Sequence, residues 1–276
     1  MAGTLYLVPT PIGNLGDVSR RTVEILETVD FIAAEDTRIT LKLLNHLGIK
    51  KPLVSYYRHN TDTAGNQILE RLLSGESCAL CTDAGTPAIS DPGEDLVALC
   101  AANDVSVEAL PGPCALVVAL SVSGLPTARF VFEGFLPLNK KNRRTRLEAL
   151  AAEERTILLY EAPHKLCATL ADLSAALGGD RRITLCRELT KLHEEILRTT
   201  ISQAAERYKT QSPRGEFVLV VEGAPAVEKA AATLTDGLMR VAQLQSEGLS
   251  RKDAVKQAAK ELDLSRNDLY TAALEQ

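Results

Sequence analysis

The sequence predicts an α/β protein with two α/β domains and a small helical C-terminal tail. Strand-like runs alternate with helix-like segments from the first residues onward, and several of these runs are apolar at nearly every position. Such runs are typical of parallel strands that helices cover on both faces. After residue 125 the strand-like runs outnumber the helix-like segments, and residues 230–276 carry only helix-like patterns. We therefore expect domains at 1–115 and 116–226, followed by a helical region at 230–276.

Five strand–helix pairs account for the first half of the chain. The expected strands lie in the runs TLYLVP, DFIAAED, PLVSYY, CALCTDAG and VSVEALPGP. The helices that follow are expected near 19–29, 40–47, 66–75, 95–102 and 114–124. Because the carboxyl ends of parallel strands lie at one edge of a sheet, we expect the loops after the strands to carry the ligand-binding residues.

The second half contains more strands than helices. Its expected strands lie in ARFVFEGFLP, TILLYEAP, RITLCREL, EEILRTTI and EFVLVVEG, and its expected helices near 143–154, 165–177 and 202–209. Gly178 and Gly179 end the second of these helices. The surplus of strands predicts a mixed sheet.

The tail carries two helix starts, because Ser250 and Ser265 each precede an amphipathic segment. The short link between these segments predicts a helix-turn-helix hairpin. Such a hairpin could contact nucleic acid, or it could serve as a capping or dimer-stabilising pair of helices. Both interpretations stay open at this point.

Composition narrows the class of protein. The 276 residues are 45% hydrophobic and 24% charged, as in a soluble globular protein. The longest apolar runs are too short to cross a bilayer, and no signal peptide is visible, so we expect a cytoplasmic protein without a membrane partner. The six cysteines do not form a disulfide pattern. Cys78 and Cys81 resemble a CxxC motif, but they lie in an apolar strand and lack further ligands at suitable spacing, which favours buried thiols and no metal.

One short cationic segment, and not the net charge of the chain, indicates nucleic-acid binding. The net charge of −5 argues against a protein that coats RNA through overall charge. The run NKKNRRTR nevertheless holds five cations without an acid, and it is a candidate for RNA contact or simply a solvated helix start. These candidates are Lys140, Lys141, Arg143, Arg144 and Arg146. The chain has no tryptophan and only 4% aromatic residues, so a platform that stacks many bases is not expected.

Four loops at expected strand ends carry residues that could hold a ligand. They are LVPTPIGNLGD, AEDTR, TDAGTPAISDPG and LPGPCA. The first occupies the position of a nucleotide-binding loop but matches neither GxGxxG nor GxxxxGK[ST], so ATP and GTP are not expected. A ligand with adenosine and amino-acid parts, bound by backbone groups and the Asp83 carboxylate, fits better. The alternative is that Asp83 and Asp91 serve only the turn.

The ordered set VPTPIGNLGD, AEDTR, DAGTP, DPG, LPGP, EGFLP, RELTK and GEFVLVVEG resembles the tetrapyrrole methylase family, in particular its branch of 16S ribosomal RNA ribose 2′-O-methyltransferases. The resemblance covers essentially the whole chain. It implies S-adenosylmethionine as donor, in a cleft between the two α/β domains. It also implies a homodimer that acts on a cytidine 2′-hydroxyl in the decoding region of the 30S subunit. Tetrapyrrole methylation is the alternative, but Pro9 and Thr10 stand where the tetrapyrrole enzymes carry glycines.

The resemblance also assigns donor-binding positions, which fall in three of the loops and in the YEAP segment. They are Pro9, Thr10, Pro11, Ile12, Thr82, Asp83, Gly85, Thr86, Pro113, Cys114, Ala115, Tyr160 and Glu161.

Methyl transfer to a hydroxyl benefits from a general base and needs no metal. The candidates are Glu35, Asp36, His59, Glu188 and Lys191, of which we select Asp36 and His59. Phosphates beside the target are expected to meet Arg38, Arg58, Arg187 and Lys191. Each of these residues has a purely structural alternative, as a helix start, a surface histidine or an ion pair. A non-enzymatic nucleic-acid-binding protein that uses the tail is the third hypothesis.

Overall fold

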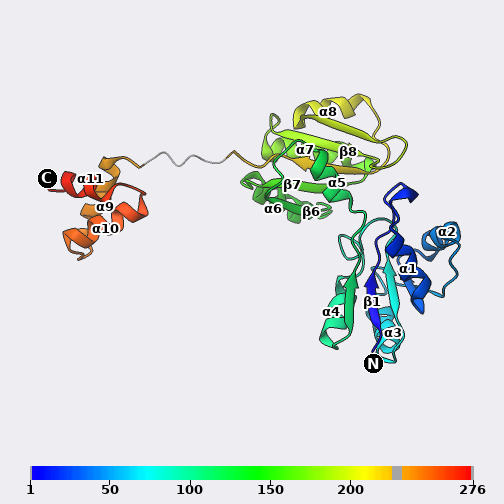
Figure 1. The fold of residues 1–276 in the computed structure, drawn as a ribbon. Helices are drawn as coiled ribbons and strands as arrows, with labels where there is room; N and C mark the ends of the chain where they lie inside the picture. Colours follow the sequence, from blue (N-terminus) through cyan, green and yellow to red (C-terminus); the bar gives the residue numbers. More distant parts are fainter. Residues whose placement is uncertain (1, 226–231, 275–276) are drawn as a thin grey trace. The chain divides into compact units, whose positions relative to one another are not determined.

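The computed structural model describes residues 2–225 and 232–274. The chain divides into two compact units, Met1–Ala224 and Pro225–Gln276 (Figure 1). The first unit contains two five-stranded sheets, and the second contains only helices where it is described. The predicted fold class is confirmed, whereas the exact ranges of the three expected domains stay a prediction.

The first sheet is entirely parallel, as predicted, with strand order β3-β2-β4-β1-β5. Its strands are β1 Thr4–Leu7, β2 Phe31–Ala34, β3 Leu53–Ser55, β4 Cys78–Cys81 and β5 Ser106–Ala109. All four residues of β2 and all four of β4 are buried, which explains their uniformly apolar sequences. Cys78 and Cys81 are therefore free, buried thiols in the middle of the sheet.

Helices cover both faces of this sheet. They are α1 Arg20–Thr28, α2 Thr37–Leu47, α3 Thr61–Leu73 and α4 Glu94–Ala102, with a 3-10 turn η1 at Leu15–Asp17. Leu26 of α1 and Leu44 of α2 pack on one face, and Ile68 of α3 and Leu96 of α4 pack on the other. Helix α3 begins five residues earlier than the sequence indicated.

The second sheet is mixed, as predicted, with strand order β6-β7-β10-β8-β9. Its strands are β6 Phe130–Gly134, β7 Thr156–Glu161, β8 Arg182–Arg187, β9 Glu195–Thr200 and β10 Phe217–Val221. Only β6 and β7 are parallel neighbours, and the other three pairs are antiparallel.

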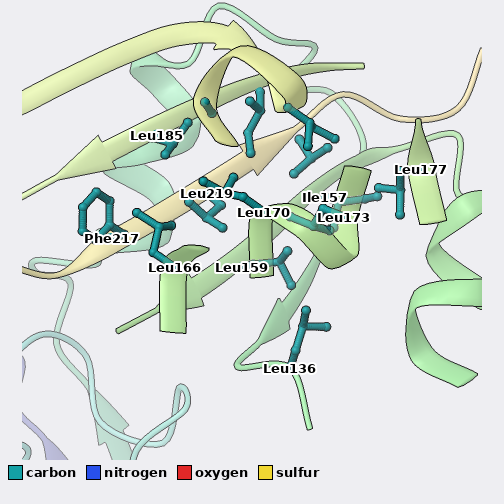
Figure 2. Close-up of a cluster of buried hydrophobic side chains, with 14 of the residues drawn as sticks. Leu136, Ile157, Leu159, Leu166, Leu170, Leu173, Leu177, Leu185, Phe217 and Leu219 are labelled. Atoms are coloured by element: carbon teal, nitrogen blue, oxygen red, sulfur yellow. The ribbon is translucent and has the colours of Figure 1, made fainter. Parts of the chain in front are cut away.

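Two cores flank this sheet because its strands alternate between faces. Helices α6 Lys140–Ala151, α7 Pro163–Leu177 and α8 Ile201–Thr210 bury the cluster shown in Figure 2, in which Leu159 and Leu219 face Leu166 and Leu170. Helix α5 Ala115–Val122 covers the opposite face together with Ile12, a residue of the first loop. The first and second halves of this unit therefore share a core.

Helix α6 begins at Lys140, three residues before the predicted start. The Asn139 side chain explains this difference, because its Oδ1 accepts the backbone N–H groups of Lys141 (3.0 Å) and Asn142 (3.2 Å). The cationic run therefore occupies the first two turns of a helix.

The C-terminal unit is a three-helix cluster of α9 Leu234–Ser246, α10 Arg251–Glu261 and α11 Arg266–Ala272. The predicted N-caps are confirmed, since Ser250 and Ser265 accept the backbone N–H groups of Asp253 and Asp268. Leu244, Val255 and Leu269 join the three helices in one core. Across the described residues, no helix is both long and apolar enough to cross a membrane.

Candidate functional site

Hydrogen bonds tie the first and third loops together at the carboxyl edge of the parallel sheet. The Thr10 N–H donates to the Gly85 carbonyl (2.9 Å), and the Gly85 N–H donates to the Thr10 carbonyl (3.0 Å). The buried Thr10 hydroxyl donates to the Thr82 carbonyl (3.0 Å). This bridge gives the two loops one fixed geometry.

The second and fourth loops join the same assembly. The Asp36 N–H donates to Asp83 Oδ1 (3.1 Å), and the Asp83 N–H donates to a Glu35 carboxylate oxygen (3.3 Å). The Thr86 hydroxyl donates to the Pro113 carbonyl (2.9 Å). The four loops that the sequence indicated therefore meet in space, because consecutive parallel strands release them at one edge.

A cavity of about 570 Å³ lies between these loops and the second sheet, within the size range that accepts small-molecule ligands. Eight of the donor-binding candidates line it: Ile12, Asp83, Gly85, Thr86, Cys114, Ala115, Tyr160 and Glu161. Five do not: Pro9, Thr10, Pro11, Thr82 and Pro113. Thr10, Thr82 and Pro113 instead supply the hydrogen bonds that join the loops.

Carboxylates dominate the charge of this cavity. Glu35, Asp83 and Asp91 line it together. Desolvation raises the pKa of Glu35 and of Asp83. Desolvation, followed by the charges of Glu35 and Asp83, raises the pKa of Asp91 to about 7.

The other charged groups of the cavity are partnered. Glu161 is buried and accepts the Ala162 N–H (2.9 Å) and the Thr169 hydroxyl. Lys191 Nζ donates to Glu188 Oε1 (2.8 Å) and Glu216 Oε2 (2.9 Å), so its charge is balanced. The cavity consequently carries an excess of negative charge, which disfavours a phosphate-rich ligand and favours a cationic one.

Aromatic side chains form part of the wall contributed by the second sheet. The Tyr160 ring lies edge-on to Phe132 and Phe135, with centroids 4.9 and 5.8 Å away. The Tyr160 hydroxyl accepts the Leu116 N–H (3.2 Å), and desolvation raises the pKa of Tyr160 to about 12. Tyr160 is therefore a neutral phenol that connects β7 to α5.

The two residues selected as the base lie outside the cavity lining. Asp36 caps α2, and hydrogen bonds from the Arg38 side chain and backbone lower the pKa of Asp36 to about 2. His59 is exposed and contacts the Tyr57 ring edge-on. A base role for either residue stays a prediction, while Glu35, another candidate, lies in the cavity wall.

The candidate RNA-binding cations differ in how much of their charge is already paired. Ion pairs hold six of them: Arg38 with Asp36, Arg143 with Asp172, Arg144 with Glu148, Arg146 with Glu133, Arg187 with Glu195, and Lys191 with Glu188 and Glu216. The Arg143 side chain is only 16% exposed. Within residues 2–225 and 232–274, no ion pair involves Arg58, Lys140 or Lys141, and all three are exposed.

Sequence reasoning did not select several residues of the cavity wall. They include Ile89, Ser90, Phe135, Leu189 and Glu216. Ile89 and Ser90 belong to the third loop, whose whole length was available as a signal. Phe135 directly follows β6 in the structure, although the sequence placed it inside the strand run ARFVFEGFLP. Among the described residues, no group of three or more His, Cys, Asp or Glu side chains is arranged to hold a metal ion.

Comparison with known families identifies the chain. The profile of the Tetrapyrrole (Corrin/Porphyrin) Methylases matches residues 4–205, and that of the RsmI C-terminal HTH domain matches residues 229–276. The chain belongs to the tetrapyrrole methylase family. Two curated relatives, both called "Ribosomal RNA small subunit methyltransferase I", place it within one branch. The relative from Synechocystis sp. is 49% identical over 99% of this chain and 98% of its own length. The relative from Escherichia coli O157:H7 is 46% identical over 99% of this chain and 96% of its own length.

Solved structures of tetrapyrrole methylases and related enzymes share the fold. A diphthine synthase superposes with a TM-score of 0.61 at 13% identity, over 80% of this chain and 90% of that one. Uroporphyrin-III C-methyl transferase from Thermus thermophilus, complexed with S-adenyl homocysteine, superposes with a TM-score of 0.58 at 16% identity, over 79% of this chain and 97% of that one. At these identities the likeness concerns the fold.

Proposed function

We propose that this chain is an S-adenosylmethionine-dependent methyltransferase that modifies the ribose 2′-hydroxyl of a cytidine in the decoding region of 16S ribosomal RNA. The observation that carries the proposal is the acid-rich cavity at the meeting point of the four loops. The names of the full-length relatives support small-subunit ribosomal RNA as the acceptor. A cytoplasmic location, a homodimer and the 30S subunit as partner belong to the same proposal.

The cavity fits this donor in both charge and polarity. S-adenosylmethionine carries a sulfonium and an ammonium group, which Asp83 and Glu35 would stabilise by opposite charge. Its adenine ring has flat faces that suit apolar contacts, which Ile12 and Ala115 offer. When bound, the donor supplies an activated methyl group, so the chain itself needs only to position the reactants and receive a proton.

Positioning is the main task of the loops. Holding a nucleophile in line with the methyl group can lower the barrier by roughly 7–11 kcal/mol. The Thr10–Gly85 bridge and the Thr86 hydrogen bond to Pro113 tie the loops of the cavity wall to one another. The wall can therefore orient a ligand without first losing the entropy of loop ordering.

Cations outside the cavity are suited to the phosphates of the acceptor RNA. Lys140 and Lys141 are exposed on the first turn of α6, and Arg58 is exposed in the loop after β3. Phosphate contacts of this kind position an RNA without reading its sequence. We propose these three residues, ahead of the paired arginines, as the principal phosphate contacts.

Tetrapyrrole methylation is the second candidate, because the matching family also contains corrin and porphyrin methylases. One assay separates the two functions. Protein and radiolabelled S-adenosylmethionine are incubated with immature 30S subunits, naked 16S ribosomal RNA or uroporphyrinogen, and the RNA is digested to nucleosides. Label in 2′-O-methylcytidine supports the proposal, and label only in the porphyrin contradicts it.

The donor site needs its own test, which calorimetry provides. Asp83→Ala should lower donor affinity at least tenfold while the circular dichroism spectrum stays unchanged, since it removes a carboxylate from the cavity wall. Glu94→Gln is the matched control, because Glu94 is exposed and does not line the cavity. Unchanged donor affinity in Asp83→Ala would show that this cavity is not the donor site.

A further inference from the structure

Two segments from opposite halves of the first unit meet at one side of the cavity. One is Ile89–Ser90–Asp91 of the third loop, and the other is Phe135, which follows β6. Their contact is close, because a Cβ on Gly134 would lie 3.2 Å from Ser90 Oγ. Asp91 follows Ser90 and Phe135 follows Gly134 in the chain, so this contact brings Asp91 and Phe135 to the same side of the cavity. Both residues line the cavity.

This side of the cavity is apolar and open to solvent. Phe135 is 55% exposed although its ring packs against the Tyr160 ring at an interplanar angle of 63°, and Ile89 is 40% exposed. Large apolar side chains at the mouth of a cavity indicate a binding surface rather than a core. A flat, half-exposed ring offers a stacking surface for one unpaired base, as in proteins that bind single-stranded RNA.

Asp91 differs from the other carboxylates of the cavity in its hydrogen bonding. Glu35 accepts the Asp83 N–H, Asp83 accepts the Asp36 N–H, and Glu161 accepts two donors. Glu216 pairs with Lys191. Over the described residues, no hydrogen bond or ion pair joins the Asp91 carboxylate to another protein group, so its oxygens are available to a ligand.

We propose that Ile89, Asp91 and Phe135 form the acceptor subsite, in which Phe135 stacks on the unstacked target base and Asp91 accepts the proton of the ribose 2′-hydroxyl. This inference rests on the proposed function and adds the residues that receive the nucleotide. The contact between Ser90 and Gly134 brings together the two segments that carry these groups.

The proton balance of the step is complete. The 2′-oxygen forms a bond to the methyl carbon, the carbon–sulfur bond breaks, and sulfur retains the electron pair. The hydroxyl proton passes to an Asp91 oxygen and then to water after the product leaves. A carboxylate that ionises near neutral pH is suited to this role, because it is both deprotonated and basic at the working pH.

The charges around Asp91 come from several elements. Glu35 after β2 and Asp83 after β4 oppose its ionisation, and Arg58 after β3 favours it. The remaining titratable groups that line the cavity are Cys114, Tyr160, Glu161, His164, Cys186, Lys191 and Glu216. Burial acts with the two acids, so the pKa of Asp91 in the free protein rises to about 7, and kcat/KM should increase with pH up to that value.

The test compares four variants on the RNA form that the wild-type protein methylates. Phe135→Ala should weaken RNA binding, measured by filter binding with S-adenosylhomocysteine present, by roughly 5- to 140-fold, the equivalent of one stacked base. Phe135→Tyr should restore binding because it retains the ring. Asp91→Asn should lower kcat by roughly 10²–10⁴-fold and abolish the increase of kcat/KM with pH below 7.

Donor affinity and a surface control separate this subsite from the donor site. Donor affinity should stay within about twofold of wild type in all variants, and Glu94→Gln should leave RNA affinity and kcat unchanged. Wild-type protein that fails to label ribose would overturn the proposed function. If wild type labels ribose, two results would overturn this subsite alone. One is an unchanged kcat and pH profile in Asp91→Asn, and the other is an unchanged RNA affinity in Phe135→Ala.

Discussion

Replacing Asp91 by asparagine should make the free protein more stable at neutral and alkaline pH. The native Asp91 carboxyl loses hydration and faces the charges of Glu35 and Asp83, which raises its pKa from 3.8 to about 7. At pH values between 3.8 and about 7, Asp91 is protonated in the native state but ionised in the unfolded state. The free energy of unfolding therefore falls as pH rises from about 4 to about 7, and stays reduced above that range. The uncharged amide of the Asp91→Asn variant would carry no such cost.

The size of the effect follows from the same shift. A rise from 3.8 to about 7 corresponds to at most ~4 kcal/mol at 1.36 kcal/mol per pKa unit. Asp91 keeps part of its surface in water, and solvent screening reduces this figure to about 1–2 kcal/mol. For a unit of this size, that gain should raise Tm by about 2–8 °C at pH 8. At pH 5 the difference should be less than half as large, because most of the titration lies above that pH.

Far-UV circular dichroism suits the measurement, since the chain has no tryptophan to report unfolding by fluorescence. Melting curves of wild type, Asp91→Asn and Glu94→Gln are recorded at pH 5, 6.5 and 8 without donor. Glu94→Gln removes a charge three residues away, on the exposed first turn of α4, and should lower stability by a few tenths of a kcal/mol through the helix dipole. A difference between Asp91→Asn and wild type that is independent of pH, or a lower Tm of Asp91→Asn at pH 8, would refute the reasoning.

Three further predictions test other parts of the molecule. Gly112→Ala places a Cβ 2.5 Å from the Pro9 Cβ. It should lower the free energy of unfolding by about 1–3 kcal/mol in thermal melts and weaken donor binding in calorimetry. Unchanged values would show that the two loops adapt freely to the added methyl group. Arg143→Gln should lower Tm because it breaks a partly buried ion pair. Lys141→Gln should leave Tm unchanged and reduce the salt slope of RNA binding by about 0.7–0.9. The reverse pattern would contradict the assignment of Lys141 to RNA phosphate and of Arg143 to the ion pair. Leu269→Ala should lower the free energy of unfolding of the C-terminal unit by about 2–5 kcal/mol in calorimetry, because Leu269 is fully buried in that unit's own core. Donor affinity should stay unchanged, and a lower donor affinity would contradict this prediction.

Local patterns in the sequence were sufficient for the order of the elements and for the four loops. The apolar runs of β2 and β4 predicted strands buried on both faces, and Ser250 and Ser265 predicted helix starts. These features depend on residues close together in the chain, so they can be read without the fold. The meeting of the loops followed from one rule, that parallel strands end at the same edge of their sheet.

Side-chain partnerships could not be read in the same way. Arg143 looked like its neighbours in a cationic run, but the packing of α6 against α7 pairs it with Asp172 and leaves Lys141 exposed. Asp36 was selected as a base from the sequence, and only the structure shows that its oxygens accept hydrogen bonds from Arg38 at the start of α2.

The sequence by itself determined an α/β chain with ligand-binding loops at strand ends, because strand alternation, apolar runs and helix caps are local properties. Only the tertiary structure decided that the third loop contacts the end of β6. That contact joins Asp91 to Phe135 across residues separated by more than forty positions, and it depends on how the two sheets share the core around Ile12 and α5. The burial and charge that raise the pKa of Asp91 arise from the same assembly, since desolvation and Coulomb interaction depend on distance in space and not on position in the chain.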